Sequence, residues 1–560
     1  MIIDSRSIDD STTFQTDLCI IGAGAAGISI ALEFLAKSYN VILLESGGIR
    51  SDPMTQSLYD GKNVGLSYDR LDEARSRYFG GSTNCWGGHC RPLDSLDFKK
   101  RDGVPNSGWP FGKEELDRYY KRSHSLLKLG PFEYDESKWS QKMAKDDLFL
   151  FPLDGECLHN VISQINPQAK FGDIYRAQLG EAANIKVLLF SNATEIQTND
   201  TATAVTGVRV RTLNGKSFTI SARIFVLAAG GIENARLLLL SNQIQKMGLG
   251  NGRDLVGRYF MDHPRIRSDI VRINAQQRHR RLYDQTMVLS RAGYFSGDAR
   301  ISAHVAPTSE CQRKLLIPNS RTYLAARYAS GMSKAYLGLR AISRQVKGRA
   351  RFGYSFGDMA RAIIRAVPAI VGNVPEAIIG VLDAHLNPGF VKRAFELWTI
   401  IEPIPNYDSR VTLSSARDRL GLNKVEVDWQ VTERDKLHFI SLRKLLTQEM
   451  TRQGVLQFVG EPVDPAEIWP KNIVGCWHHM GTTRMDSDPA KGVVDANCRV
   501  HGISNLFVAG SSVFPTAGSD MPTITIVALA LRLAGELAAN LGRAGSQGCG
   551  DVWRLGGRKR

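Results

Sequence analysis

A glycine-rich turn between two short apolar runs constrains the fold of this chain more than any other feature. Residues 18–21 form an apolar run that passes directly into GAGAAG, and a helical stretch continues to Ala36. A second apolar run, 41–44, ends at Glu45, 18 residues after Gly27. This order of strand, turn, helix and strand with an acid at its tip predicts a Rossmann-type unit that binds a dinucleotide.

The glycines of this turn are where a pyrophosphate needs them. Gly22 permits the tight turn out of the strand, Gly24 lets the backbone approach the phosphates, and Gly27 allows the helix to pack closely on the sheet. The helix start supplies unpaired N–H groups to the phosphates, and Glu45 is suited to a ribose diol. The turn alone does not distinguish NAD from FAD. The residues predicted to bind the dinucleotide here are Gly22, Gly24, Ala25, Ala26, Gly27 and Glu45.

The length and composition indicate a globular protein of two or more lobes, because 560 residues with 43% hydrophobic side chains can bury a large core. Residues 264–462 lack dinucleotide-binding signals, and short apolar strands resume at 506–508. We therefore predict an α/β fold, α+β overall, in which a Rossmann-type lobe is built from both chain ends and a substrate-binding lobe, a sheet covered by helices, is inserted. The predicted boundaries are 1–110, 181–264 and 464–545 for the cofactor lobe, 111–180 for a cap or substrate-lobe segment, 265–463 for the substrate lobe and 546–560 for a basic tail.

Targeting signals and metal motifs are not evident in the sequence. The 8 cysteines are spread singly, which is typical of reduced thiols in a cytosolic protein. Residues 1–14 lack the pattern of a secretory signal, so we expect a cytoplasmic location. Residues 524–541 are apolar but carry Arg532 and Glu536, and we expect a buried helix there. No His, Cys and Asp spacing resembles a metal site.

The net charge of +15 is compatible with a nucleic-acid surface, an anionic membrane or a solvated face. Residues 334–365 hold eight basic side chains and one acid, and the chain ends with three more basic residues at 558–560. We favour a solvated face and expect no nucleic-acid partner. Residues 359–386 interleave aliphatic side chains with Arg361 and Arg365, as in a basic amphipathic helix; we favour a helical cap over the substrate site, and membrane-surface association is the alternative.

Five segments of the chain resemble the glucose-methanol-choline oxidoreductases in the same order. They include RYFGGSTNCWGGHCRPLD, FVLAAGGIENARLLLLS and the C-terminal HHMGTTRMDSDP, NLFVAGSSVFPT and TIVALALR; the segments are 78–92, 225–241, 257–264, 405–413 and 478–534. The similarity is strongest to bacterial sugar and polyol dehydrogenases and to the pyranose-oxidase-like branch. It implies an FAD enzyme that acts on CH–OH donors.

The resemblance also implies further contacts to FAD. We expect the ring system to lie against the glycine pairs around Trp86. The additional cofactor-binding residues are Gly80, Gly81, Thr83, Asn84, Cys85, Gly87, Gly88, Thr194, Ala229, Gly230, Gly510, Ser511, Pro522 and Thr523. Cys85 stands where pyranose oxidases carry a histidine bonded to the flavin. We expect non-covalent FAD and an unreacted thiol, with a thioether from Cys85 as the alternative.

The resemblance assigns the catalytic base to the first position of HxxGT, which is His478. Neighbouring side chains in extended backbone point to opposite faces, so His479 should not share that role. A neutral imidazole with a pKa near 6.5 is suited to accept the hydroxyl proton. The family's second active-site position, usually Asn or His, falls on Met521, which cannot accept a proton. Asp520 could substitute, His263 could reach in from another loop, or the second group could be dispensable.

These residues predict FAD-dependent oxidation of a CH–OH group of a sugar, cyclitol, glycoside or polyol-like molecule to a carbonyl, with hydride passing to flavin N5 and His478 as base. One alternative is an atypical or lyase-like flavin reaction in the same fold. Another is a peripheral membrane or partner-binding protein with structural FAD. The sequence leaves oxygen, a quinone and a redox protein open as electron acceptors. For His89 and His501 a backbone hydrogen bond is a sufficient role.

Overall fold

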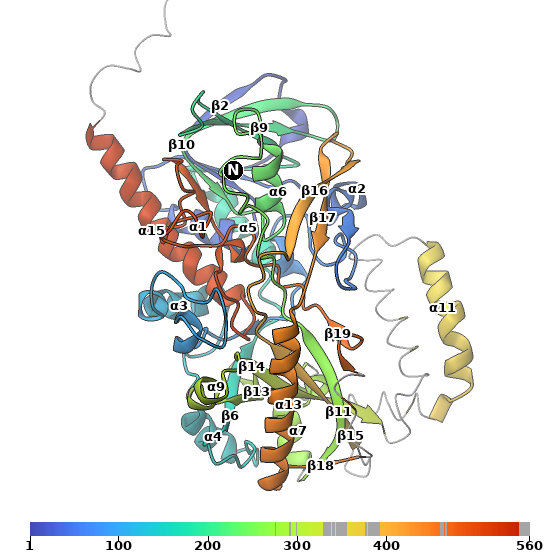
Figure 1. Cartoon of the computed structure of the whole chain (residues 1–560). Coiled ribbons are helices and arrows are strands. Elements are labelled where there is room, and N and C mark those ends of the chain that lie inside the picture. Colours follow the sequence, from blue (N-terminus) through green and yellow to red (C-terminus); the bar gives the residue numbers. More distant parts are fainter. Residues whose placement is uncertain are drawn as a thin grey trace, which may run out of the picture.

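The computed structural model describes residues 1–547 except 275, 290–292, 298, 329–337, 339–341, 343–355, 376–377, 379–392, 460–463 and 465–467. Two large sheets divide the molecule, one at the top and one at the bottom of Figure 1. Most of the basic run 334–365 and the basic end of the chain lie outside the described residues.

The first sheet is parallel at its centre and extended by an antiparallel pair. Residues 18–21 and 41–44 are at most 5% exposed, because helices cover both faces of these strands. β20 comes from the far end of the chain and pairs in parallel with β10, as expected for a lobe built from both ends. Across the sheet lie β1 (Ile2–Asp4), β7 (Ile185–Leu189), β3 (Val41–Leu44), β2 (Thr13–Ile21), β10 (Ser217–Leu227), β9 (Val205–Arg211) and β8 (Asn192–Thr198), with β20 (Leu506–Val508) beside β10.

Helices surround this sheet and connect it to the rest of the lobe. The first helix ends at Glu33, three residues before the predicted end. The last helix contains the apolar stretch expected to be buried, and it packs against α1 and α3. By length and composition it could cross a membrane, but 61% of its most apolar window is buried inside the protein. The helices are α1 (Ala25–Glu33), α3 (Glu114–Leu126), α5 (Phe171–Glu181), α6 (Glu233–Leu240) and α15 (Thr523–Gln547).

The second sheet is antiparallel and joins strands from distant parts of the chain. β5 and β6 precede residue 180, so the predicted segment 111–180 contributes a strand to the same sheet as residues 265–463. Across the sheet lie β18 (Leu456–Phe458), β11 (Arg265–Ile273), β15 (Arg393–Ile401), β14 (Ser320–Tyr328), β13 (Ala299–Pro307), β6 (Leu158–Ile165) and β5 (His89–Cys90); β12 (Tyr294–Ser296) pairs with β13 and β19 (Ile473–Val474) with β11.

This second sheet has two chemically different faces, because side chains alternate along each strand. One face is apolar and belongs to a core that also contains Phe439 and Leu442 of α13 (Glu433–Arg452). The other face is polar and aromatic. Register places Val161 opposite His304, and Trp398 opposite both Tyr323 and Arg267. Residues paired in this way share a face, so a row of mostly polar and aromatic side chains crosses the sheet from His304 to Arg267.

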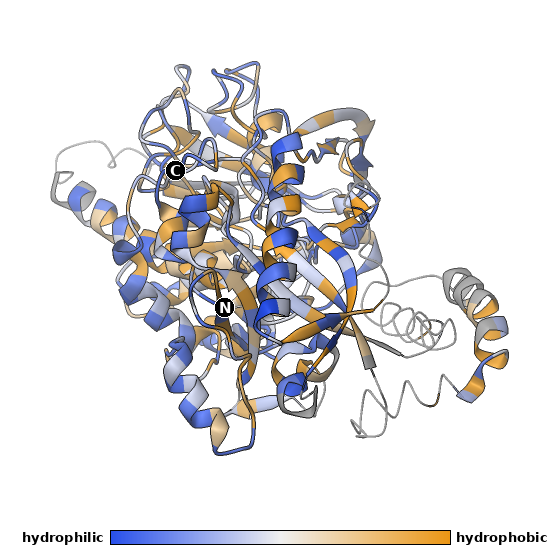
Figure 2. Ribbon diagram, turned by 60° about the horizontal axis from the view of Figure 1, so that its bottom comes forward, coloured by the Kyte–Doolittle hydropathy of each residue, from blue (hydrophilic) through white to orange (hydrophobic). Residues whose placement is uncertain are grey.

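A small sheet and several short helices complete the described fold. In Figures 1 and 2 the helix α11 lies beside the body of the molecule, and its aliphatic side chains Ile364, Val367 and Val371 are exposed. The remaining elements are β16 (Arg410–Arg417), β17 (Asn423–Asp428), β4 (Gly61–Asn63), α2 (Pro53–Gln56), α4 (Glu136–Ala144), α7 (Gln276–Tyr283), α8 (Gln285–Val288), α9 (Ser309–Leu315), α11 (Phe356–Val371) and the 3-10 helices η1 (Ser5–Ser7), η2 (Ser57–Tyr59), η3 (Gly81–Asn84), η4 (Ser95–Phe98) and η5 (Ser511–Val513).

The packing of α1 on β2 gives a direct test. A Cβ added to Gly27 would lie 1.9 Å from the Gly22 carbonyl oxygen, whereas one added to Gly535 in α15 would meet nothing within 4 Å. We expect Gly27→Ala to lower the free energy of unfolding by about 1–3 kcal/mol, the range for overpacking. Gly535→Ala is the matched control and should raise it by about 0.5–1 kcal/mol. Thermal unfolding of both variants measures this, and equal stability of the two would contradict the close approach.

Candidate active site

Two histidines from distant loops meet where the two sheets adjoin. His478 follows β19, and an antiparallel bridge between Met261 and Met480 aligns its loop with the loop that carries His263. The Nδ1 atoms of His478 and His263 are 2.8 Å apart, although the residues are 215 positions apart in the chain. His263 is fully buried, and His478 is half-buried.

The hydrogen-bond partners determine which nitrogen of each ring carries a proton. The His263 Nε2 lies 2.7 Å from the Gly518 carbonyl oxygen, and because a carbonyl only accepts, this nitrogen must donate. Burial lowers the pKa of His263, so its ring is neutral and its Nδ1 accepts. His478 must then donate from Nδ1. These assignments follow from the partners and leave the Nε2 of His478 unprotonated.

Burial lowers the pKa of His478 well below 6.5, and electrostatic interactions with the neighbouring imidazoles of His263 and His479, and then with Arg265 and His89, lower it further. The sequence suggested an ordinary value near 6.5. The difference arises because desolvation disfavours the charged ring. His478 is therefore neutral throughout the physiological pH range.

A buried carboxylate holds the backbone of the His478 loop. The Asp262 side chain is fully buried and accepts the N–H groups of Trp477 and His478 at 2.9 Å and 2.8 Å. It also accepts the hydroxyl of Tyr68. Sequence reasoning did not single out Asp262 or Tyr68. The signal available was the position of Asp262 directly before His263.

His479 has separate partners, as expected for the neighbour of His478 in extended backbone. Its Nε2 is 3.0 Å from the Tyr68 hydroxyl, and its carbonyl accepts the Ser511 hydroxyl at 2.7 Å. The side chain is 7% exposed. The imidazole of His479 is thus engaged in packing between the loops.

The other predicted catalytic positions differ from each other. Asp520 is 1% exposed, and Arg321 binds its carboxylate through Nη2 at 2.6 Å and Nε at 3.2 Å. Arg91 approaches the same carboxylate at 3.6 Å. Met521 is half-buried. Asp520 therefore serves in an ion pair, and this engagement leaves it poorly placed to act as a free base.

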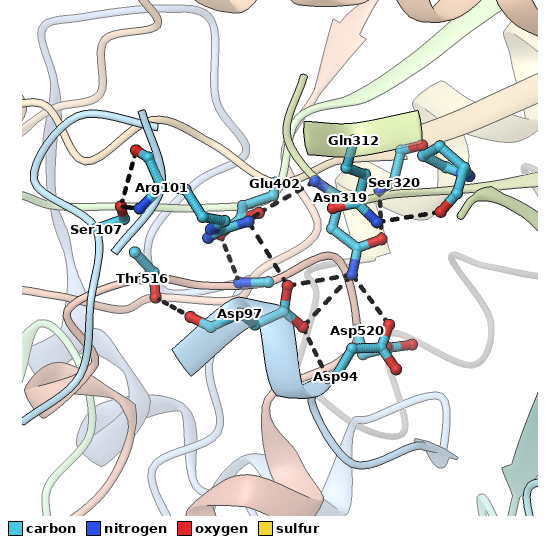
Figure 3. Close-up of polar contacts among 12 residues, drawn as sticks. Asp94, Asp97, Arg101, Ser107, Gln312, Asn319, Ser320, Glu402, Thr516 and Asp520 are labelled. Carbon is cyan, nitrogen blue, oxygen red and sulfur yellow. Dashed lines mark hydrogen bonds and ion pairs between the residues drawn. The ribbon is translucent and has the colours of Figure 1, made fainter. Parts of the chain in front are cut away.

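Asp520 lies in a buried polar cluster with Asp94, Asp97, Arg101, Asn319 and Glu402 (Figure 3). This cluster reaches His263 through Gly518. Glu402 accepts two hydrogen bonds from Arg101, at 2.7 Å and 2.5 Å, and a third from the Gly518 N–H at 3.2 Å. Asn319 donates to Asp97 at 3.1 Å. The carbonyl that orients His263 thus belongs to a residue whose own N–H is held by a buried ion pair.

The predicted dinucleotide turn has the geometry its glycines require. Gly22 adopts φ +111°, and a Cβ there would lie 2.6 Å from the Ala228 carbonyl oxygen. Glu45 accepts the N–H groups of Ala23 at 3.2 Å and Gly47 at 2.8 Å. These bonds place an acid at the end of β3, next to the turn after β2, where a ribose is expected.

Several predicted cofactor residues come together around this turn. A Cβ on Gly81 would lie 2.9 Å from the Gly24 Cα, and Gly230 and Gly510 combine positive φ with open space around the Cβ position. The indole N–H of Trp86 is buried without a hydrogen-bond partner among the described residues. Open backbone at strand ends and an orphaned donor fit a bound FAD.

The remaining predicted cofactor residues have mixed placements. The Cys85 thiol donates to the Ser82 carbonyl at 3.4 Å, and Gly88 packs against Asn166. The hydroxyl of Thr194 on β8 donates to the Arg209 carbonyl at 3.2 Å, and no described contact ties it to the turn after β2. The other predicted cofactor residues lie at the ends of helices and strands: Thr83 and Asn84 in η3, Gly87 before β5, Ala229 after β10, Ser511 at the start of η5, and Pro522 and Thr523 at the start of α15.

The two histidines expected to make only backbone hydrogen bonds differ. His501 does so, with its Nε2 2.9 Å from the Asp486 carbonyl oxygen. For His89 the expectation was wrong, because its Nε2 lies 3.2 Å from the side-chain oxygen of Gln285. The reason is that β5 places His89 at the polar face of the second sheet. Within the described ranges, no group of three or more His, Cys, Asp or Glu side chains is arranged to hold a metal ion.

Two protein families match this chain. The GMC oxidoreductase model matches residues 405–530, and a model described as FAD dependent oxidoreductase matches residues 17–247. The second match covers the glycine turn and Glu45, and the first covers His478 and Gly518. FAD is therefore the cofactor that this fold binds.

Individual proteins are similar over nearly the whole chain. The 2-methyl-1,2-propanediol dehydrogenase of Mycolicibacterium austroafricanum is 24% identical over 92% of this chain and 94% of its own length. The fructose dehydrogenase large subunit of Gluconobacter japonicus is 25% identical over 94% of this chain and 99% of its own length. The crystal structure of pyridoxine 4-oxidase from Mesorbium loti has the same fold, with a TM-score of 0.55 and 17% sequence identity. The match covers 93% of this chain and 99% of that protein. The chain is therefore similar to the GMC oxidoreductases along most of its length and is an FAD-dependent oxidoreductase.

Proposed function

We propose that this protein oxidises the CH–OH group of a sugar-like or polyol-like small molecule to a carbonyl, with His478 as the base. The observation that carries the proposal is the chain of hydrogen bonds from His478 to His263 and from His263 to the Gly518 carbonyl, which assigns an unprotonated Nε2 to His478. Two relatives support the substrate class, since their names specify a diol and a sugar.

FAD, the two histidines and Asp262 have different roles in the proposed alcohol oxidation. FAD, when bound, supplies the two-electron acceptor for the hydrogen on the alcohol carbon. The Nε2 of His478 takes the hydroxyl proton, and the ring then carries a proton on both nitrogens. His263 stabilises this form because its Nδ1 accepts the Nδ1–H of His478 in both states. Asp262 keeps the loop in place through two backbone N–H groups.

The polar face of the second sheet is suited to a molecule with several hydroxyl groups. The Nδ1 of His304 is buried without a hydrogen-bond partner among the residues described, and the side chain is 2% exposed. Its ring lies 5.7 Å from that of Tyr323 and 6.5 Å from that of His89, measured between centroids. Its Nε2 lies 3.2 Å from the Ser302 hydroxyl, so only Nδ1 lacks a partner. A buried ring nitrogen without a partner is costly unless a ligand satisfies it.

The contact between His263 and His478 also explains how methionine is compatible with this chemistry at position 521. An Asn or His at that position would offer the substrate oxygen a second polar group. Here His263 contacts the base directly, and Arg321 engages Asp520. Of the three possibilities raised by the sequence, this geometry supports the one in which His263 reaches in from another loop.

Alanine variants should show which of the two adjacent histidines acts as the base. We expect His478→Ala to bind FAD and to lower the rate of substrate-driven flavin reduction by about two to four powers of ten, the range for removal of a general base. His479→Ala and Asp520→Asn should retain most of that rate in the fraction that folds, because their side chains are hydrogen-bonded to Tyr68 and Arg321 and not to His478. Anaerobic stopped-flow absorbance measures it. A normal rate in His478→Ala with a large loss in either companion variant would move the base to that residue.

The depressed pKa of His478 predicts the pH dependence. The base works only when neutral, and a pKa below 6.5 keeps it neutral down to mildly acidic pH. The acid limb of the flavin-reduction rate should therefore have its midpoint below pH 6.5. Arg265→Leu should move the midpoint upward, because it removes a positive neighbour. A midpoint at pH 7 or above in the wild-type enzyme would contradict the proton assignment.

The flavin should be bound without a covalent link. The Cys85 thiol donates to a backbone carbonyl in the η3 turn, which is an ordinary contact for an unreacted cysteine. We expect acid denaturation to release all FAD into the supernatant, in wild type and in Cys85→Ser alike. Flavin fluorescence that stays with the wild-type chain in a denaturing gel and disappears in Cys85→Ser would show a thioether instead.

A further inference from the structure

Two arginines on the polar face of the second sheet contact the same indole ring. The guanidinium carbons of Arg265 and Arg267 lie 4.8 Å and 4.7 Å from the ring centroid of Trp398. Both arginines lie on β11 and are separated by one residue, so their side chains share a face. The Trp398 Nε1–H donates to Glu396 at 2.7 Å, which fixes the plane of the ring. The guanidinium groups are thus held in place by packing rather than by an ion pair.

The positive charge of these arginines is not matched within the described part of the chain. Neither forms an ion pair with a described Asp or Glu, and the Nε atom of each is buried without a hydrogen-bond partner. Tyr323 and Cys476 act on Arg265 electrostatically, and Tyr323 also forms a side-chain hydrogen bond with it. Asp262 follows as the one carboxyl group among these neighbours, and its oxygens already accept from Tyr68, Trp477 and His478. By contrast, Arg321 on the same face is bound by Asp520.

The two arginines adjoin the base. Arg265 pairs in register with Val474 of β19, four residues before His478. It is also one of the positive groups that act on His478. The row of aromatic contacts continues from Trp398 to Tyr323, whose ring centroid is 6.0 Å away, and from Tyr323 to His304. The unmatched charge therefore lies at one end of the face that we assign to the substrate.

We propose that Arg265 and Arg267 form an anion subsite, so that the alcohol oxidised by this enzyme carries a carboxylate or a phosphate. This inference rests on the proposed function and specifies its substrate class. A guanidinium presents a planar fork of N–H donors that matches carboxylate and phosphate oxygens. Stacking on Trp398 holds the forks in one orientation, which lowers the entropy lost when an anion binds. The buried Nε–H donors would gain the acceptors that the described residues do not provide.

Matched substrates test the subsite by turnover. The probes are gluconate against sorbitol, glucuronate against glucose, and glucose 6-phosphate against glucose. We expect one or both anionic classes to reduce the flavin at least tenfold more efficiently, in kcat/KM, than the neutral partner. The carboxylate and phosphate arms distinguish the two sources of the anion. Equal efficiency of neutral and anionic partners would overturn the proposal.

Variants of Arg267 show whether the preference belongs to this position. Arg267→Leu should reduce kcat/KM for the preferred anion by about tenfold to a hundredfold, the range for a lost charge-assisted hydrogen bond, and reduce that for the neutral partner by a clearly smaller factor. Arg267→Lys keeps the charge but not the fork, and should be intermediate. Arg272→Leu is the matched control, because Arg272 is an exposed arginine on the same strand. An equal loss in Arg272→Leu would show a general charge effect and refute the subsite.

Binding without turnover separates this proposal from the proposed function. Calorimetric titration of the FAD-loaded enzyme with gluconate, glucuronate and glucose 6-phosphate should show saturable binding of at least one, weakened at least tenfold in Arg267→Leu and unchanged in Arg272→Leu. If that result holds while no alcohol reduces the flavin, the subsite stands and the proposed oxidation fails. If alcohols reduce the flavin but none of the three anions binds in an Arg267-dependent way, the subsite fails and the oxidation stands.

Discussion

The hydrogen bond from His263 to the Gly518 carbonyl sets the direction of proton donation between His263 and His478. A carbonyl accepts and never donates, so this 2.7 Å contact leaves one tautomer for each of the two rings. The unprotonated Nε2 assigned to His478 therefore depends on the position of the Gly518 carbonyl. Its N–H is bound by Glu402, and Glu402 is bound by Arg101. A positive φ of +59° at Gly518 makes this conformation difficult for other residues.

The buried polar cluster that binds the Gly518 N–H contains nearly equal numbers of acidic and basic side chains. Four carboxylates, from Asp94, Asp97, Glu402 and Asp520, face the arginines 91, 101 and 321. Burial and the neighbouring carboxylates of Glu402 and Asp94 raise the pKa of Asp97 well above its usual value, which favours a proton on Asp97 and offsets the missing fourth cation. Removing one partner from a buried ion pair costs about 3–5 kcal/mol, so the loss of any single member of the cluster should be strongly destabilising.

Local patterns predicted the cofactor lobe well and the assembled site only in part. Residues 41–44 and 506–508 form strands as expected, and the glycines between 22 and 27 adopt the predicted turn, because alternation, apolar runs and glycine act over a few residues. His478 was identified through a resemblance. The contact between His478 and His263 was left open as one of three possibilities, since it joins loops 215 residues apart. The role of Asp262 and the unmatched arginines on β11 depend on tertiary pairing that periodicity does not encode.

The two sheets provide different surfaces because their strands pair differently. Helices cover both faces of the parallel strands, so a ligand can reach this sheet at the carboxyl ends of its strands. The predicted cofactor residues lie there: Gly22, Glu45, Gly230 and Gly510 follow the ends of β2, β3, β10 and β20. The antiparallel sheet buries one face in the core with α13 and keeps the other polar. Side chains on that polar face can change without loss of the packing beneath them, since alternate residues supply the core. Specificity can therefore vary on β11, β13, β14 and β15 while the loop of His478 and its support stay constant.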